Sequence, residues 1–302
     1  MHEKAAFVNL LFHQTALGDF ALTLPIVRGL WATGQRTVVV APWSRAWLAS
    51  RLVEGVAPMD IELWEFSRLH AEGGPTSVSP AVEELFEKAQ RIVSFVSSGG
   101  DHWATNVRNR ISTATIACID PRPPQDWAGH VTEWHHRQLA SQGIELESVP
   151  VEPWKVKGKY IVIHPGSGGK EKCWPLDRFE QLIRTLRDRG KQVLPVFGEV
   201  ELATWTPEQV EHWQQELGAT LLMTPEALYQ TLTGAALFVG NDAGPTHLAA
   251  QMGLATIALY GPTDPKRWSP MGPAVTILAP DAPKPMDWLE AGAVLDACEQ
   301  KG

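Results

Sequence analysis

Three polar side chains of different chemistry follow an apolar segment at residues 237–239: the acid Asp242, the hydroxyl of Thr246 and the imidazole of His247. The pattern predicts a buried strand, a turn and a helix over residues 246–252. The amino end of a helix that follows a parallel strand binds anions through its free N–H groups. This stretch is therefore a candidate anion site that also carries an acid and a base.

The same turn also has a purely structural interpretation. Asn and Asp are good helix caps, and Asn241 and Asp242 precede the helix, while Pro245 suits its first turn. We expect both residues to cap the helix and Gly253 to end it. From these residues alone, capping and ligand binding both remain open for Asp242 and Thr246.

A glycine-rich loop at residues 166–170, Gly-Ser-Gly-Gly-Lys, follows another apolar segment. Glycines let backbone N–H groups approach a phosphate closely, and Lys170 or Lys172 could supply positive charge. The loop is not a P-loop, because Glu171 stands where Ser or Thr is required. Phosphate binding and a plain surface turn are equally good interpretations of the loop by itself.

A third candidate is Asp19, which follows an apolar strand expected at residues 6–12. No G-x-G-x-x-G pattern is present, so a dinucleotide fingerprint is not supported. Ligand-facing residues lie just past the carboxyl ends of such strands. Asp19 is therefore either a ligand-facing carboxylate or only a helix cap, and Pro25 should start or kink the helix that follows.

Strand and helix patterns alternate along the whole chain, which predicts an α/β protein with parallel sheets. A Pro-rich segment at 145–158 reads as a linker between domains at 1–150 and 151–302, and the last helix could cross back to the first domain. Strands are expected at residues 6–12, 37–41, 61–66, 92–96, 115–119, 160–164, 192–197, 220–223, 237–239, 256–259 and 275–278. Helices are expected at 18–34, 80–90, 103–110, 131–142, 175–189, 206–217, 225–233, 246–252 and 286–299.

Composition excludes several classes of protein. The 302 residues carry a net charge of −8, which argues against a nucleic-acid binder. No run of eighteen apolar residues occurs, the start of the chain is no convincing signal peptide, and three scattered cysteines fit a reduced, cytoplasmic protein. His130, His135 and His136 lack metal spacing and are expected on a solvated helix face, whereas Ser97 to Asp101 could face a ligand cleft.

Taken together, these motifs resemble glycosyltransferase family 9, the lipopolysaccharide heptosyltransferases. The matching segments are ALGDFALTLP, HPGSGGKEKCWPLDRF, FGEVE and NDAGPTHLAAQMGLATIALYGPTDPKRWSP, spread over residues 16–270. The resemblance implies a GT-B fold, in which two Rossmann-like parallel-sheet domains face each other across a cleft. It further implies an N-terminal acceptor domain, a C-terminal domain for a nucleotide sugar such as ADP-heptose, no metal or other cofactor, and inversion at the anomeric carbon.

The resemblance also implies roles for individual residues. Asp19 matches the catalytic base, and Lys172 matches the lysine that neutralises the diphosphate leaving group. Glu201 matches the acid that holds the ribose, with Glu199 as a competitor. The other implied donor-binding residues are Ser167, Gly168, Met223, Asp242, Ala243, Gly244, Thr246 and His247, among which Ala243, Gly244 and Thr246 would present N–H groups to phosphate.

The N-terminal half has few basic residues, which favours an acceptor less acidic than is usual for the family. The leading hypothesis is transfer of heptose from ADP-heptose to a glycolipid or polysaccharide of lipopolysaccharide-core type. The protein is then expected in the cytoplasm, and the sequence permits peripheral contact with the inner face of the inner membrane. Two alternatives remain open: the same chemistry with another nucleotide sugar and polysaccharide, and a non-catalytic protein that binds nucleotide sugars. Retention of both Asp19 and Lys172 argues against the last.

Overall fold

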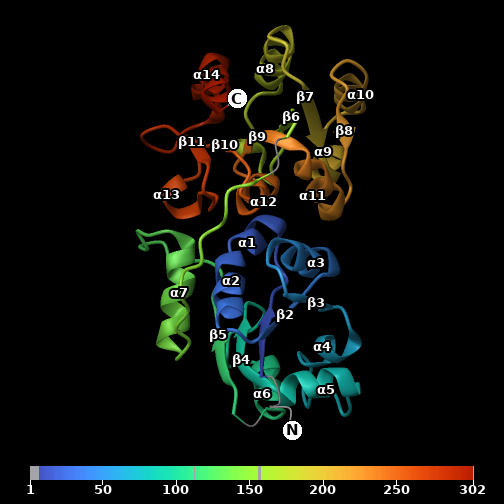
Figure 1. Cartoon of the computed structure of the whole chain (residues 1–302), viewed down its shortest axis with the longest axis vertical. Helices are drawn as coiled ribbons and strands as arrows, with labels where there is room; N and C mark the ends of the chain where they lie inside the picture. The colour runs from blue at the N-terminus through green and yellow to red at the C-terminus, as the bar shows by residue number, and fades with distance from the viewer. Residues whose placement is uncertain (1–6, 112, 156–157, 302) are drawn as a thin grey trace. The chain divides into compact units, whose positions relative to one another are not determined.

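The computed structural model describes residues 7–111, 113–155 and 158–301, so Ala6 and part of the expected linker lie outside the described residues. The chain separates into two compact units, Met1–Val149 and Pro150–Gly302, each built on its own sheet (Figure 1).

Unit 1 contains a five-stranded sheet in which every pairing is parallel. The strand order is β3-β2-β1-β4-β5. From β1 the chain adds strands toward one edge of the sheet, and from β4 it adds them toward the other edge, so the switch point lies between β1 and β4. At such a switch point the connections leave on opposite faces and open a crevice at the carboxyl ends of the strands. The strands are β1 (Val8–Phe12), β2 (Arg36–Ala41), β3 (Ala57–Asp60), β4 (Ala89–Ser94) and β5 (Thr115–Cys118).

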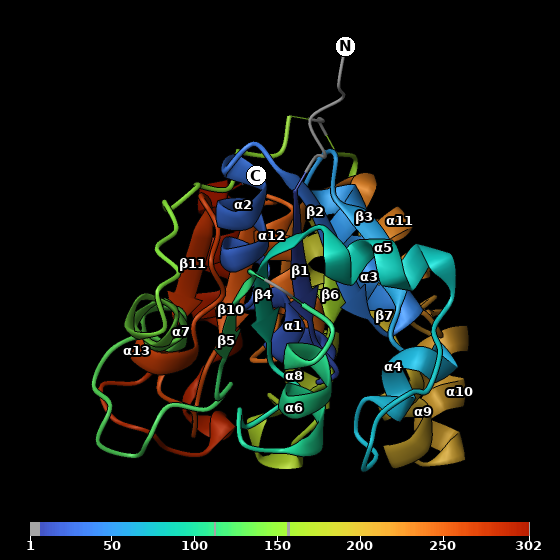
Figure 2. The same cartoon turned by 90° about the horizontal axis from the view of Figure 1, so that it is seen from below.

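Helices cover both faces of this sheet. Figure 2 shows α2 and α7 on one side of it and α5 and α6 on the other. On the side of α5 and α6 the sheet and helices share a buried apolar cluster, which includes Phe12, Phe86 and Trp103. The helices of unit 1 are α1 (Leu17–Ala21), α2 (Leu24–Ala32), α3 (Trp43–Leu52), α4 (Trp64–Arg68), α5 (Pro80–Glu87), α6 (His102–Arg108) and α7 (Val131–Ser141).

Two expectations for unit 1 meet opposite outcomes. The predicted effect of Pro25 is confirmed, because the chain forms two helices instead of one and Pro25 lies in the first turn of α2. The predicted strand at 61–66 is wrong, since the strand is β3 and residues from Trp64 onward are helical. Pro58 lies inside β3, where a proline is tolerated because β3 is an edge strand. A proline argues against a strand in a sequence pattern, which is why β3 was not predicted at residues 57–60. Helix α3 was not predicted.

Unit 2 contains a six-stranded sheet with order β11-β10-β9-β6-β7-β8, again parallel in every pairing. Its order reverses between β6 and β9. The glycine-rich loop follows β6 and the Asp242 turn follows β9, so the two candidate anion loops meet at the switch point. The strands are β6 (Tyr160–His164), β7 (Val193–Phe197), β8 (Thr220–Leu221), β9 (Ala235–Asn241), β10 (Thr256–Leu259) and β11 (Val275–Leu278).

The last helix packs within unit 2. Val294 and Cys298 of α14 lie in the buried core with Phe179 and Leu186 of α8, so the chain's final helix contacts α8. In the described part of the chain, every helix is too short or too polar to span a bilayer. The helices of unit 2 are α8 (Leu176–Asp188), α9 (Glu199–Thr204), α10 (Pro207–Gln215), α11 (Pro225–Thr233), α12 (Gly244–Gln251), α13 (Pro265–Trp268) and α14 (Ala291–Lys301), with 3-10 turns η1 (Lys170–Lys172) and η2 (Met286–Trp288).

Candidate active site

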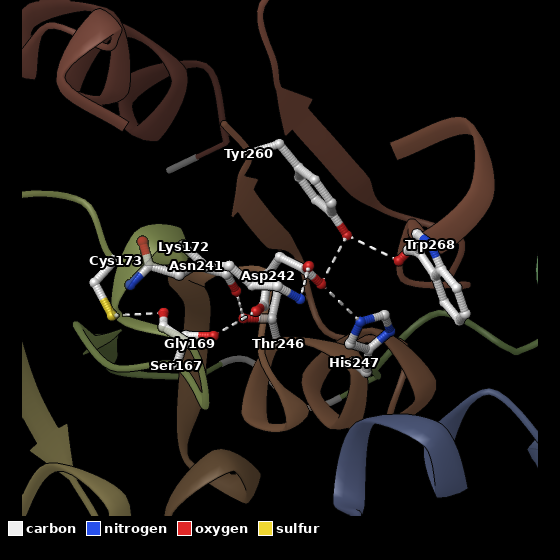
Figure 3. A network of polar contacts seen from close by, with 10 residues as sticks. All are labelled: Ser167, Gly169, Lys172, Cys173, Asn241, Asp242, Thr246, His247, Tyr260 and Trp268. Atoms are coloured by element: carbon white, nitrogen blue, oxygen red, sulfur yellow. Dashed lines mark hydrogen bonds and ion pairs between the residues drawn. The ribbon is translucent and has the colours of Figure 1, made fainter. Parts of the chain in front are cut away.

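The loops after β6 and β9 are joined by polar contacts between residues far apart in the sequence (Figure 3). The Ser167 hydroxyl donates to the backbone oxygen of Asp242 over 2.8 Å. Lys172 Nζ lies 2.8 Å from Asp242 Oδ2, as an ion pair in which the lysine side chain is 34% exposed and the aspartate 7%. This ion pair holds the lysine ammonium beside the amino end of α12.

Asn241 holds the glycine-rich loop in place and does not cap α12. Its Nδ2 donates to the Pro165 oxygen over 2.7 Å, and its Oδ1 accepts from the Trp174 N–H at 3.0 Å. The residue at the cap position is Ala243, with no side-chain hydrogen bond. The prediction that Asn241 and Asp242 cap this helix is therefore wrong, because both side chains are used across the loops.

Thr246 is fully buried and contributes to the shape of the turn. Its hydroxyl donates to the Asn241 oxygen at 2.5 Å, and its N–H donates to the Ala243 oxygen at 3.0 Å. The expectation that Thr246 presents an N–H to phosphate is thus not met. Among the described residues, the N–H groups of Ala243 and Gly244 have no acceptor, so they are the donors this helix offers to an anion.

Asp242 is surrounded by donors on both carboxylate oxygens. His247 Nε2 lies 3.4 Å from Oδ1, and the Tyr260 hydroxyl, which donates to the Trp268 oxygen at 2.9 Å, also lies 3.4 Å from Oδ1. Burial raises the pKa of Asp242, but the contacts with His247 and Lys172 outweigh burial and lower the pKa to about 2. Asp242 is therefore ionised at neutral pH. Tyr260 was not predicted as part of this site, although it directly follows the buried strand β10.

The other expected acid, Glu201, is also buried, at 3% exposure in the first turn of α9. Its Oε2 accepts from the Gly198 N–H at 2.7 Å and lies 3.5 Å from His164 Nε2. Burial raises the pKa of Glu201, and the hydrogen bonds from His164 and Gly198 lower it, with a net decrease. Glu199, the competing candidate, is exposed. Glu201 is the acid whose position is fixed.

Two further expected residues of this region lie in the open. Met223 follows β8 and is 50% exposed, although it is apolar. Gly168 has open space where a side chain would begin. The glycine-rich loop and the segment after β8 therefore leave accessible surface at the same carboxyl edge of the sheet.

Comparison with known proteins decides the family. The model of glycosyltransferase family 9 (heptosyltransferase) matches residues 103–288, which is most of the chain. The chain belongs to glycosyltransferase family 9. Lipopolysaccharide heptosyltransferase 3 of Escherichia coli K12 is 33% identical over 119 residues, covering 38% of this chain and 34% of that protein. A second Escherichia coli heptosyltransferase 3 is 29% identical over 161 residues, or 47% of each chain. The matches thus span a third to a half of these relatives.

Solved structures of the family share the fold over nearly the whole chain. The E. coli heptosyltransferase WaaC with ADP has a TM-score of 0.69 at 19% identity, covering 98% of this chain and all of that one. E. coli ADP-heptose lipopolysaccharide heptosyltransferase II has a TM-score of 0.70 at 18% identity, covering 97% and 98%. The predicted GT-B class with two parallel-sheet units is confirmed.

In unit 1 of this family 9 protein, Asp19 lies in the first turn of α1, directly after the loop that leaves β1. It is half-buried, and α1 is capped at Ala16 without any side-chain hydrogen bond. Among the described residues the Asp19 carboxylate makes no hydrogen bond or ion pair. The capping interpretation of Asp19 therefore has no contact to support it.

Other polar residues of unit 1 have structural roles. Asp101 caps α6 by accepting from the Ala104 N–H at 3.0 Å and from the Ser97 hydroxyl at 2.7 Å. The expectation of a solvated histidine face is wrong for His135, which is 2% exposed and lies 3.1 Å from the Pro121 oxygen. In the residues that are described, no group of three or more His, Cys, Asp or Glu side chains could hold a metal.

Proposed function

We propose that this protein is an inverting glycosyltransferase that moves heptose from ADP-heptose to a saccharide acceptor of lipopolysaccharide-core type. The observation that carries the proposal is the contact of Lys172 with Asp242 at the switch point of unit 2, beside the free N–H groups of Ala243 and Gly244. A lysine and two N–H groups suit a diphosphate, and the names of the family relatives supply the class of sugar.

The proposed donor site uses the loops of unit 2. Glu201 accepts hydrogen bonds from the ribose hydroxyls, and the exposed Met223 packs on the adenine. Ser167, Gly168 and the first turn of α12 surround the phosphates. Asp242, kept ionised by His247 and Lys172, accepts hydrogen bonds from hydroxyls of the transferred sugar.

In the proposed reaction, Asp19 takes the proton of the acceptor hydroxyl as the oxygen attacks the anomeric carbon of the heptose. The bond between that carbon and the ADP oxygen breaks, and the new glycosidic bond forms on the opposite face. Negative charge develops on the departing diphosphate, where Lys172 and the N–H groups of Ala243 and Gly244 stabilise it. These protein groups supply the charge that a metal ion provides in other enzymes, so the proposal requires no metal. With a lipid-linked acceptor, the protein would work in the cytoplasm at the inner face of the inner membrane.

A thermal-shift series with ADP, ADP-heptose, UDP and GDP tests the donor assignment. A ligand that binds only the folded state stabilises it by about 2.7 kcal/mol at one hundred times its dissociation constant. We expect ADP and ADP-heptose to raise the melting temperature at concentrations where UDP and GDP do not. A preference for UDP or GDP would refute the donor but keep the chemistry. Binding of ADP-heptose without transfer to any core-type saccharide would point to a non-catalytic binding protein.

A further inference from the structure

A buried histidine lies beside Glu201, and the proposed reaction gives it no role. His164 is the last residue of β6 and is 6% exposed. Its Nε2 lies 3.5 Å from Glu201 Oε2, which also accepts from the Gly198 N–H at 2.7 Å. Nδ1 of the same ring is buried and has no hydrogen-bond partner in the described part of the chain. The polar contact that this imidazole makes is therefore the one with Glu201.

Capping of α9 does not explain the pair of His164 and Glu201. Glu201 accepts from the N–H of the residue that precedes the helix, as the third residue of a capping box does. Helix α10 has the same arrangement, in which Gln209 accepts from the Thr206 N–H at 2.9 Å, but that contact is exposed and is made without a histidine. A cap thus needs neither burial nor a second donor, so both features of Glu201 require a different explanation.

Two donors on one carboxylate oxygen fix the orientation of a long side chain. A mobile glutamate loses rotamer freedom when it binds a ligand, and that loss weakens binding. Glu201 is already ordered by Gly198 and His164. Gly166 leaves room for the other oxygen, because a Cβ at that position would overlap Glu201 Oε1. The contact with His164 also offsets part of the cost of burying the carboxylate.

We propose that His164 is a positioning residue, which holds the Glu201 carboxylate in the orientation that binds the ribose hydroxyls of the nucleotide. The inference rests on the proposed function, because that function assigns the ribose to Glu201. It adds a consequence for selectivity. The protein should distinguish a nucleotide that has both ribose hydroxyls from one that lacks a hydroxyl, and His164 should set the size of that preference without contacting the nucleotide itself.

Titration calorimetry of the full-length protein with ADP, 2′-deoxy-ADP and 3′-deoxy-ADP tests the proposal. We expect the wild type to bind ADP more tightly than at least one of the two deoxynucleotides. His164→Leu should weaken ADP binding by about three- to tenfold, the usual net contribution of one hydrogen bond, and should weaken that deoxynucleotide less. His164→Gln keeps an N–H donor and should recover most of the affinity for ADP. Adding His164→Leu to Glu201→Gln should cause no further loss, because the histidine acts through the carboxylate.

NMR of the wild-type protein labelled with ¹⁵N at the imidazoles gives a measurement that does not require His164→Leu to fold. The ring assigned to His164, by its absence from His164→Gln, should carry a proton on Nε2, the nitrogen that faces Glu201. A ring with its only proton on Nδ1 would overturn the proposal, because such a ring has no hydrogen to donate to the carboxylate.

A second histidine–glutamate pair of unit 2 provides a matched control. Nε2 of His212, on α10, lies 2.9 Å from Glu180 Oε2, on α8, and the histidine side chain is 40% exposed. An exposed pair contributes little, so His212→Leu should leave the binding of all three nucleotides unchanged.

Equal losses of ADP and of both deoxynucleotides in His164→Leu would indicate a purely structural histidine and overturn the proposal. The same holds if His164→Leu and His212→Leu bind ADP equally well. A wild type that binds ADP but does not distinguish the deoxynucleotides would refute the role of Glu201 at the ribose, and the role of His164 with it. A wild type that does not bind ADP would instead refute the proposed donor. The two failures are therefore distinguishable.

Discussion

Asp19 is the residue for which chemistry and structure separate most cleanly. A carboxylate that caps a helix contributes stability, but Asp19 makes no capping bond, so Asp19→Asn should leave the melting temperature nearly unchanged. As the proposed base it contributes to the rate, and its loss should slow transfer by ~10²–10⁴-fold. Product formation from ADP-heptose and the thermal shift with ADP are measured on the same preparation. A variant that transfers normally, or that fails to bind ADP, would contradict the assignment.

Lys172 pairs with Asp242 and has a proposed role in catalysis, and one substitution tests both. Lys172→Met removes the charge proposed to stabilise the leaving diphosphate and leaves the buried Asp242 without its ion-pair partner. Transfer should fall at least 100-fold, and the free energy of unfolding should fall by about 1–2 kcal/mol at pH 7, since the lysine is partly exposed and screened by solvent. Lys170 is exposed in the same 3-10 turn, and Lys170→Met is the control. Similar effects in both variants would refute a specific role for Lys172.

At the scale of elements, local patterns predicted much and strand order could not be predicted. Residues 160–164 form β6 and residues 225–233 form α11, as the apolar pattern and the position of Pro225 indicate. The contact of Ser167 with Asp242 spans 75 residues and exists only because β6 pairs with β9. No local pattern contains that pairing. It became predictable only through resemblance to a family whose topology is known.

The loop after β6 also shows why two neighbouring glycines differ. A side chain at Gly166 would begin 1.5 Å from Glu201 Oε1, whereas one at Gly168 would meet nothing within 4 Å. Gly166→Ala must displace the buried Glu201, so we expect it to lower the free energy of unfolding by roughly 1–3 kcal/mol and to weaken ADP binding. Gly168→Ala should keep the stability of the wild type. Urea unfolding of both variants provides the comparison, and equal stability of the two would show that Glu201 adapts at little cost.

For the molecule as a whole, the residues that the resemblance singled out are brought together more clearly in unit 2 than in unit 1. Ser167, Lys172 and Asp242 meet at the switch point between β6 and β9, whereas Met223 follows β8. The capping role expected of Asp242 and the N–H expected of Thr246 were wrong. In unit 1 only Asp19 was given a catalytic role. Asp101, in the segment expected to face a ligand cleft, caps α6, and the burial of His135 was not foreseen. Histidine burial depends on packing between distant segments, which composition and spacing do not contain.

Those buried histidines predict how the stability of the whole chain depends on pH. Burial lowers the pKa of His13 to about 3, with smaller contributions from Arg45 and His135. Burial likewise lowers the pKa of His135 to about 4; its Pro121 hydrogen bond and Asp120 raise it, whereas His136 and His130 lower it. Unfolded histidine binds a proton near pH 6.5, so between that pH and these folded values the unfolded state holds more protons. Stability is therefore complete above about pH 6.5 and falls as the pH decreases.

The size of this effect follows from the same linkage. At pH 5 each histidine should cost about 2 kcal/mol, a large share of the ~5–15 kcal/mol typical of folded proteins. Asp242, with a pKa of about 2, adds its own loss only below about pH 4, so the two ranges can be separated. Urea unfolding at pH 7 and pH 5 gives the slope for the wild type. His13→Gln has no group to protonate and should reduce the difference between the two pH values by about half. A variant with the same difference in stability between pH 7 and pH 5 as the wild type would show that protonation of His13 does not cause the acid sensitivity.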